Sequence, residues 1–384
     1  MLKNEHEFVL NLIKQEFNNE YLLNTDIDWS YIIELCNTHR LLPILYNRVK
    51  NSSVTPKHIK QLLLNNYKAN ECKSLDSKKE YLNVLENLAA NGVDVILLKG
   101  VYLSNKCYSD FAERLYGDMD ILIKSSDKQQ TFDILAKLGY TQGSFDYHQK
   151  KVKLYDPGRL LDYEQELQHY GEFVKASDSI FTSCFSIDVH HRLNTSFDNF
   201  SYDIEELFDR AIRDNIDGIG FLKLSNEDFL LHLISHLYVH TLTIQDIISD
   251  NDIRLSRYYD IALFVYQHPI NWDKLFKFAE SYNLTNALYC VLYHCQLIFG
   301  NIVPNNYYAQ LDPNKLIELS NTIHDKWFTR NTLTPVGRWS EGFMERLFDE
   351  NRKYKALFSF YNDYVMSEVL FKGNYFEVVD ISSK

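Results

Sequence analysis

The chain has 384 residues, and its 40 Lys and Arg against 52 Asp and Glu give a formal net charge of −12. Proteins that hold a nucleic-acid backbone by counterion release carry a basic excess or a basic run, and this sequence has neither, which argues against bulk nucleic-acid binding. The apolar share of 45% and the charged share of 24% are those of an ordinary globular protein. The length exceeds what one hydrophobic core organises, so we expect two or three domains.

Thirteen Gly and seven Pro are few for this length, whereas 27 Tyr and 24 Phe are many, a balance that favours long helices over a turn-rich all-β fold. Charged residues interrupt the apolar positions near the N-terminus, unlike in a signal peptide, and His294 and Gln296 interrupt the most apolar later stretch. The six cysteines are scattered and form no CxxC pair. We therefore expect a cytoplasmic protein without membrane spans, whose thiols are reduced and mostly buried.

The first quarter of the chain has apolar residues at helical spacing. The pattern predicts helices from Glu5 to about Lys50, with Asp28 as the N-cap of one of them, and a second helical stretch from about Pro56 to Ala90. Asn91-Gly92 is a good helix stop. This region carries no chemical motif, and we expect it to be a helical lead-in.

An α/β pattern begins at Val93. The apolar, β-branched run Val93–Leu98 predicts a buried strand, Val101–Cys107 a short helix, Asp118–Ile123 a second strand and Cys184–His190 a third strand that closes the sheet.

Two further segments lie between the second and third predicted strands. Ser126 and Gln129 have the spacing of a capping box, which would open a helix from Asp127 to Leu138. The residues from Tyr140 to Asp178 are weakly patterned and predict a hairpin plus an insertion.

Helical periodicity returns at Ser225, which can cap the first of several helices; the others are predicted at Arg254–Gln267, Trp272–Tyr282 and Ala287–Phe299. The expected fold is α+β and mostly helical, with a small mixed sheet flanked by helical regions. We divide it into an N-terminal helical region (1–85), an α/β core (86–224) and a C-terminal helical domain (225–384).

Three aspartates within the predicted strands are the most informative residues. Asp118 and Asp120 follow Gly117, and side chains two apart on a strand share one face, with Cα atoms about 7 Å apart. Like charges so close raise each other's pKa unless a cation lies between them. Asp188 is a third carboxylate in an apolar strand, and three carboxylates with a nucleotide's phosphates suit two Mg²⁺ ions.

A plainer interpretation is that the D-x-D pair is solvated surface at a strand end, because this pattern alone is weak. The third aspartate in a buried strand is difficult to explain in that way.

These motifs resemble the uncharacterised nucleotidyltransferase family of the DNA polymerase beta superfamily, from about Leu82 to about Ile302. The resemblance is carried by Leu97-Leu98-Lys99-Gly100, Tyr108, Arg114, Gly117-Asp118-Met119-Asp120-Ile121-Leu122-Ile123, Ile187-Asp188-Val189-His190-His191-Arg192-Leu193, Asp228-Phe229-Leu230-Leu231-His232-Leu233-Ile234-Ser235-His236, Tyr258-Tyr259-Asp260-Ile261-Ala262-Leu263 and Asn271-Trp272-Asp273.

The resemblance implies transfer of a nucleoside monophosphate, AMP from ATP, to a hydroxyl of a small molecule, peptide or protein, with release of pyrophosphate. It implies that Asp118 and Asp120 ligate Mg²⁺ or Mn²⁺ and hold the triphosphate. Asp188 would ligate the catalytic ion and could accept the hydroxyl proton. The alternative is a catalytically silent module that senses nucleotides or binds proteins.

The candidate nucleotide-binding residues are Lys99, Gly100, Arg114, Gly117 and His190. Lys99-Gly100 stands where better-studied members of the superfamily have a Gly-Ser turn. Gly100 still allows close approach to phosphate, and Lys99 would supply positive charge.

Several of these polar residues have structural alternatives. Arg114 would either contact phosphate or pair with the aspartates, and His190 would either touch substrate or be packed, whereas His191 should point to the other side of the sheet. In an apolar helix, Asp260 has Arg257 as its expected partner.

The remaining basic residues have simpler expectations. Lys124 and Lys128 should be solvated. The helical stripe His232, His236 and His240 lacks an HExxH pattern, so we favour packing against the α/β module over zinc binding, with His232 or His236 as possible linings of the acceptor pocket.

Overall fold

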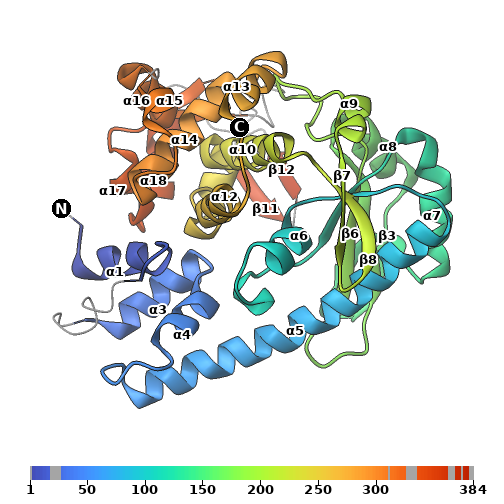
Figure 1. Ribbon diagram of the computed structural model, residues 1–384, viewed down its shortest axis with the longest axis horizontal. Coiled ribbons are helices and arrows are strands. Elements are labelled where there is room, and N and C mark those ends of the chain that lie inside the picture. The colour runs from blue at the N-terminus through green and yellow to red at the C-terminus, as the bar shows by residue number, and fades with distance from the viewer. Residues whose placement is uncertain are drawn as a thin grey trace.

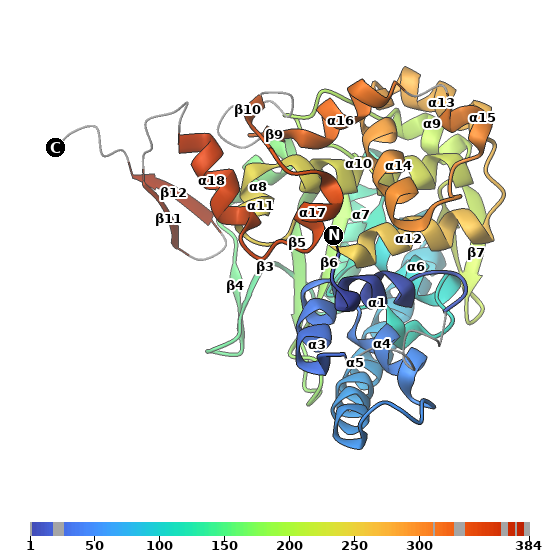
Figure 2. The same cartoon turned by 90° about the vertical axis from the view of Figure 1, so that its left-hand side faces the viewer.

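The computed structural model describes residues 2–17, 27–309, 312–325, 335–361, 368–372 and 375–379. Within these ranges a mixed sheet lies beside two groups of helices, one from each end of the chain (Figures 1 and 2). The predicted class, α+β with a mixed sheet and flanking helical regions, is confirmed, and the sheet is larger than expected.

The N-terminal helices follow the predicted pattern. Asp28 caps its helix by accepting hydrogen bonds from the backbone of Ser30 and Tyr31. The long helix ends at Ala90 with Asn91 as its C-cap, and the following Gly92 has φ +75°, a conformation that favours glycine. The helices are α1 (Asn4–Leu12), α3 (Trp29–Thr38), α4 (Leu42–Val49) and α5 (Lys57–Ala90).

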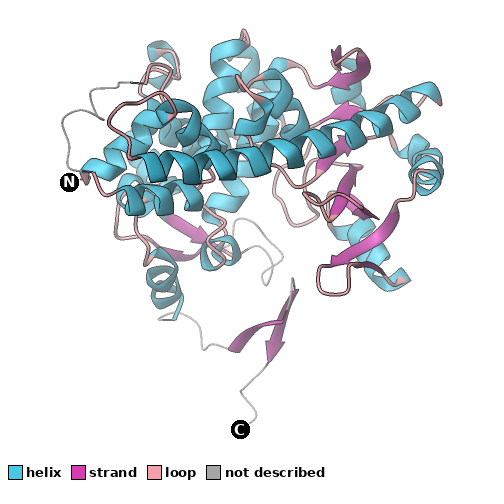
Figure 3. Ribbon diagram, turned by 90° about the horizontal axis from the view of Figure 1, so that it is seen from below, coloured by secondary structure: helices cyan, strands magenta, loops and turns pink. Residues whose placement is uncertain are grey.

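Helix α5 connects the N-terminal helices to the sheet, because it runs from one to the other along the molecule (Figure 3). Its residue Glu80 accepts hydrogen bonds from Tyr140 at 3.0 Å and from Lys175 at 2.7 Å. Tyr81, one residue further, is buried against Phe185 of the sheet. One helix therefore supports two parts of the chain that are far apart in sequence.

The central sheet has eight strands in the order β4-β3-β5-β6-β2-β1-β8-β7. Strand β2 pairs in parallel with β6 and antiparallel with β1, and β1 pairs in parallel with β8. The third predicted strand is therefore an interior strand and does not close the sheet. The strands are β1 (Ile96–Leu97), β2 (Met119–Leu122), β3 (Thr141–Asp146), β4 (Lys151–Leu154), β5 (His169–Ala176), β6 (Cys184–His190), β7 (Ile212–Ile216) and β8 (Ile219–Lys223).

Several predicted boundaries move. The first strand has two residues, Ile96–Leu97, because only these pair with β2, and the next helix begins at Lys99, before the predicted Val101. The predicted capping box is wrong: a 3-10 turn over Ser125–Asp127 shifts the helix start, so Ser126 is not the N-cap. The helices here are α6 (Lys99–Lys106), α7 (Lys128–Lys137), α8 (Pro157–Glu166) and α9 (Ile204–Asp209), with 3-10 turns η1 (Phe111–Glu113) and η2 (Ser125–Asp127).

The segment from Tyr140 to Asp178 contains the predicted hairpin, formed by β3 and β4. The rest is not an insertion, because β5 pairs with both β3 and β6 and so belongs to the central sheet.

The C-terminal part is helical as predicted. Ser225 caps α10 by accepting a hydrogen bond from the backbone of Asp228. None of the helices in the described residues is long and apolar enough to cross a membrane. The elements are α10 (Asn226–Leu242), α11 (Ile244–Ile248), α12 (Leu255–Gln267), α13 (Trp272–Ser281), α14 (Thr285–Phe299), α15 (Asn305–Tyr308), α16 (Pro313–Asn321), α17 (Phe343–Leu347) and α18 (Arg352–Tyr361), with two antiparallel strand pairs, β9 (Thr322–His324) with β10 (Pro335–Arg338) and β11 (Glu368–Lys372) with β12 (Tyr375–Val379).

One hydrophobic core joins all three regions. Phe8 from the N-terminal helices, Tyr102 from the α/β part and Phe229 from α10 belong to one continuous cluster and are at most 1% exposed. The rings of Phe229 and Phe264 stack at 4.7 Å. The cysteines are free, and most of them are buried, as expected. The regions therefore share their largest source of stability.

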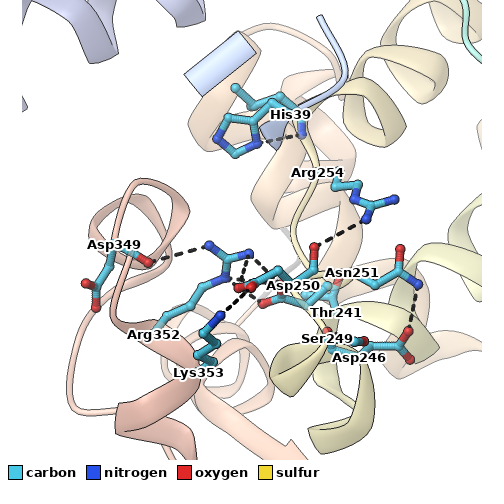
Figure 4. Close-up of polar contacts among 12 residues, drawn as sticks. His39, Thr241, Asp246, Ser249, Asp250, Asn251, Arg254, Asp349, Arg352 and Lys353 are labelled. Carbon is cyan, nitrogen blue, oxygen red and sulfur yellow. Dashed lines mark hydrogen bonds and ion pairs between the residues drawn. The ribbon is translucent and has the colours of Figure 1, made fainter. Parts of the chain in front are cut away.

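A buried ion pair fastens the last long helix to the body. Arg352, the first residue of α18, donates to Asp252 at 2.9 and 3.1 Å, and these side chains are 5% and 2% exposed. The neighbouring Lys353 pairs with Asp250 at 2.7 Å, but both of those side chains are partly exposed. Figure 4 shows these two basic residues converging on the loop after α11.

We predict that Arg352→Met lowers the free energy of unfolding by about 3–5 kcal/mol, because it leaves the buried Asp252 carboxylate without its partner. Lys353→Met is the matched control and should cost no more than about 1 kcal/mol, since water screens its ion pair. Urea unfolding of both variants measures the difference. Equal losses would contradict the assignment of the anchor to Arg352.

Candidate functional site

Two carboxylates lie side by side at the centre of the sheet. Asp120 in β2 and Asp188 in β6 are register partners in the parallel pair, so their side chains share one face of the sheet. Asp120 is 6% exposed and Asp188 is half-buried. The backbone pairing therefore places two acidic groups together in a poorly hydrated position.

Asp120 has two basic partners on one oxygen. Its Oδ1 lies 3.1 Å from Lys99 Nζ and 3.0 Å from His190 Nε2. Burial by itself raises the pKa of Asp120, but Lys99 and His190 outweigh burial and hold this pKa below its usual value. Lys99 is the first residue of α6 and has φ +28°, a conformation uncommon for a residue with a side chain. These contacts favour the ionised form of Asp120.

The other two aspartates lack such compensation. Burial first, then the charges of Asp118 and Asp120, raise the pKa of Asp188 well above its usual value, and its Oδ1 is buried without a hydrogen-bond partner. Burial first, then the charge of Asp120, raises the pKa of Asp118 to about 6. These carboxyl groups gain from an added cation, because it would favour their charged forms.

The donor set fits a divalent metal ion. Ligand atoms of Asp120, Asp188 and His190 lie within 4.8 Å of one another, the one such group of three among the described residues. Carboxylate oxygens suit Mg²⁺ or Mn²⁺, and the unpartnered oxygen of Asp188 is free to bind. Asp118 does not belong to this group; it precedes β2 and acts on it through its charge.

The predicted phosphate-binding residues are distributed around this centre. Gly100 is the second residue of α6, and a Cβ there would lie 3.2 Å from Arg114 Nη1 and from Tyr116 Cβ, so a side chain would be crowded. Gly117 is exposed and has open space around it. Lys99 and His190 contact Asp120 directly.

Arg114 does not pair with the aspartates of the site, so that alternative is wrong. It donates to both carboxylate oxygens of Asp260, at 2.8 and 2.9 Å, and Tyr108 donates to the same carboxylate at 2.8 Å. The predicted Arg257–Asp260 pair is therefore also wrong. Arg257 instead donates to Asn251. The long-range packing of α12 against the loop before β2 brings Asp260 to Arg114, and local helix spacing could not show this.

The other basic residues singled out in the sequence lie outside the carboxylate centre. His191 points away from His190 and stacks on Tyr170 at 4.5 Å, as the strand alternation indicates. Lys124 and Lys128 are partly exposed and form surface ion pairs with glutamates.

A cavity of about 230 Å³ is lined by Lys99 and His190, the two residues that contact Asp120, although Asp120 and Asp188 are not themselves part of its lining. Its lining includes Lys99, Glu172 and His190 from the α/β part. Helix α10 covers the other side and contributes His232, His236 and His240. Figure 1 shows α10 between the sheet and the C-terminal helices.

Glu172 and His169 were missed by sequence reasoning. They lie in β5, where Glu172 is the register partner of Asp188 and His169 that of His190. Both line the cavity. Only the pairing of β5 with β6 reveals them, because their segment has no strand pattern strong enough to give the register.

The sequence matches the family described as uncharacterised nucleotidyltransferase over residues 25–300. The chain belongs to this family. The match begins at residue 25, so it also includes most of the N-terminal helical region. No curated protein matches the chain.

Among solved structures, the chain is similar to a crystal structure of an antigenic nucleotidyltransferase-like protein from Paracoccidioides brasiliensis. The identity is 12%, the TM-score is 0.27, and the match covers 56% of this chain and 92% of that one.

We predict that Asp118→Asn stabilises the metal-free protein above about pH 6. The folded pKa of about 6 exceeds the unfolded value of about 3.9, so the wild type loses stability as pH rises through this window and the variant does not. Thermal melting in EDTA at about pH 8 and about pH 4.5 measures this. The exposed Asp133→Asn is the control, and a gain that does not grow with pH would contradict the repulsion.

Proposed function

We propose that this protein is a metal-dependent nucleotidyltransferase that moves AMP from ATP to a hydroxyl group and releases pyrophosphate. The observation that carries the proposal is the Asp120–Asp188 pair, held at the centre of the sheet with an unpartnered oxygen. The family assignment supports the same reaction class. The acceptor is a small molecule or a peptide or protein side chain.

Asp120 and Asp188, with Asp118 beside them, would hold the divalent cation. A bound cation would supply positive charge to the triphosphate and to the developing charge on the reacting oxygens. Lys99 would orient the Asp120 carboxylate and add a second positive charge near the phosphates. The net charge of −12 is compatible with a triphosphate ligand because these groups reverse the local sign.

The reaction would exchange one bond for another at the α-phosphorus. The acceptor oxygen forms a bond to phosphorus, the bond from phosphorus to the bridging oxygen breaks, and pyrophosphate leaves with that electron pair. Residues at this site can position the reactants and stabilise charge, which account for most of the catalysis in phosphoryl transfer.

We predict that Asp120→Asn and Asp188→Asn each weaken Mg²⁺-dependent ATP binding by more than about 100-fold, because loss of an outer-shell partner alone typically costs roughly 10–100-fold. Calorimetry with ATP, GTP, CTP and UTP, with and without Mg²⁺, measures the binding. Asp133→Asn is the exposed control. Circular dichroism confirms that the variants are folded.

The rival function is a silent module that senses nucleotides or binds a protein. Binding of ATP without AMP transfer to any component of a lysate would favour nucleotide sensing. Failure of all four nucleotides to bind the wild type would overturn the transferase and favour protein binding.

A further inference from the structure

Helix α10 presents a row of histidines to the cavity beside the carboxylates. His232, His236 and His240 lie four residues apart and line the same cavity as Lys99 and His190, the two partners of Asp120. An acceptor in this cavity would therefore lie against Lys99 and His190, which contact the metal-binding carboxylate Asp120, and against the histidines of α10. The proposed transfer needs a group there that removes the proton of the acceptor.

Two of these histidines form a chain of hydrogen bonds with an aspartate. His240 Nδ1 lies 2.8 Å from Asp246 Oδ1, and His240 Nε2 lies 3.3 Å from His236 Nε2. Asp246 belongs to the short helix α11, directly after α10. All three residues line the cavity, so the chain runs along its wall from Asp246 to His236.

The chemistry of the groups fixes the direction of these bonds. An ionised Asp246 only accepts, so His240 must donate through Nδ1. A neutral His240 then has a lone pair at Nε2, so His236 must donate through its own Nε2. This leaves the lone pair of His236 at Nδ1. That atom has no hydrogen-bond partner among the residues the structure describes, and His236 lines the cavity.

Further hydrogen bonds fix Asp246, the end of the hydrogen-bond chain opposite His236. Asn251 donates to Asp246 at 3.0 Å, as Figure 4 shows, and Arg257 donates to Asn251 at 2.6 Å through the backbone oxygen and 3.1 Å through the side chain. The same loop carries Asp252, which anchors Arg352. Asp246 is therefore positioned by its own outer contacts, as in other carboxylate–histidine pairs.

Burial and the charges around the chain favour the neutral forms of these histidines in the absence of ligand. Burial lowers the pKa of His236, and the positive charges of Lys99 and Arg257 lower it further. For His240, burial also lowers the pKa, and Asp246 opposes this. His232 faces His236 on the same helix, and its own pKa is lowered in the same way. A bound triphosphate would offset the charges of Lys99 and Arg257 and raise the proton affinity of His236.

We propose that Asp246, His240 and His236 form a proton relay in which His236 Nδ1 is the general base for the acceptor hydroxyl. The inference rests on the proposed function. His236 is the catalytic residue, and His240 and Asp246 are positioning residues.

The proton of the acceptor hydroxyl moves to His236 Nδ1, the acceptor oxygen bonds to the α-phosphorus, and pyrophosphate leaves with the electrons of the broken phosphorus–oxygen bond. The imidazolium of His236 is stabilised through His240 by Asp246 and returns its proton to solvent after the products leave. Asp188 then serves as a metal ligand and does not have to accept the proton.

The first experiment measures the tautomers directly. In the full-length protein labelled with ¹⁵N-histidine, long-range ¹H–¹⁵N spectra should show His236 protonated at Nε2 and His240 protonated at Nδ1, with His236→Gln and His240→Gln assigning the signals. Proton at His236 Nδ1 would overturn the relay. So would a stoichiometric zinc ion in the purified protein bound through the two Nε2 atoms, because it would occupy the lone pair that His240 needs.

The second experiment measures pyrophosphate release from ATP and Mg²⁺ with water as the acceptor. His236→Gln should lower the rate by roughly 10²–10⁴-fold and remove the rise of the rate with pH, while Mg²⁺-dependent ATP binding stays unchanged. Asp246→Asn should lower the rate and shift the pH profile, and Asp246→Glu should restore part of it, which a purely structural role would not produce. His268→Gln, a half-buried histidine stacked on Phe264 at 4.2 Å, is the matched control.

Different results would overturn the proposed transferase and the proposed relay. Loss of Mg²⁺-dependent nucleotide binding in the wild type would overturn the transferase whatever the tautomers are. A His236→Gln rate within about threefold of a measurable wild-type rate would overturn the relay and leave the transferase intact.

Discussion

The constraint on which this structure depends is the placement of acidic groups side by side in the middle of a sheet. The parallel pairing of β2 with β6 fixes Asp120 opposite Asp188, and Asp118 adds a third charge two residues away. Lys99 is hydrogen-bonded to Asp120 alone, and its charge does not offset the effect of burial on the other two. The interior strands could be filled with apolar residues at lower cost, so the carboxylates are costly to the fold, and the proposed role as metal ligands would account for that cost.

Helix α12 connects this centre to the rest of the C-terminal helices. Its Asp260 accepts a hydrogen bond from Arg114, which lies in the loop before β2. Its Arg257 donates to Asn251, the residue that donates to Asp246. Both walls of the cavity therefore depend on one helix. A displacement of α12 would disturb both the loop before β2 and the Asp246 end of the histidine chain. This helix therefore supports the site although it is far from the carboxylates in sequence.

The sequence predicts local features well and long-range pairing poorly. The caps at Asp28 and Ser225, the C-cap of α5 at Asn91 and the limits of β6 follow from short-range rules, and the structure confirms them. The partners of Arg114 and Asp260 do not, because they lie 146 residues apart. Glu172 is similar: its closeness to Asp188 follows from a strand register that only the assembled sheet determines.

The two sides of the cavity are chemically different, and this difference favours group transfer over simple binding. On the sheet side, Lys99 and His190 line the cavity and contact Asp120, whose pair with Asp188 would gain from a cation, whereas on the α10 side the proposed relay would take a proton. A site that only held a nucleotide would need the first side alone. A phosphoryl transfer to a hydroxyl needs positive charge at the phosphate and a proton acceptor at the hydroxyl at the same time. Groups suited to both needs lie in or next to the cavity, and this agrees better with the proposed transfer than with nucleotide binding alone.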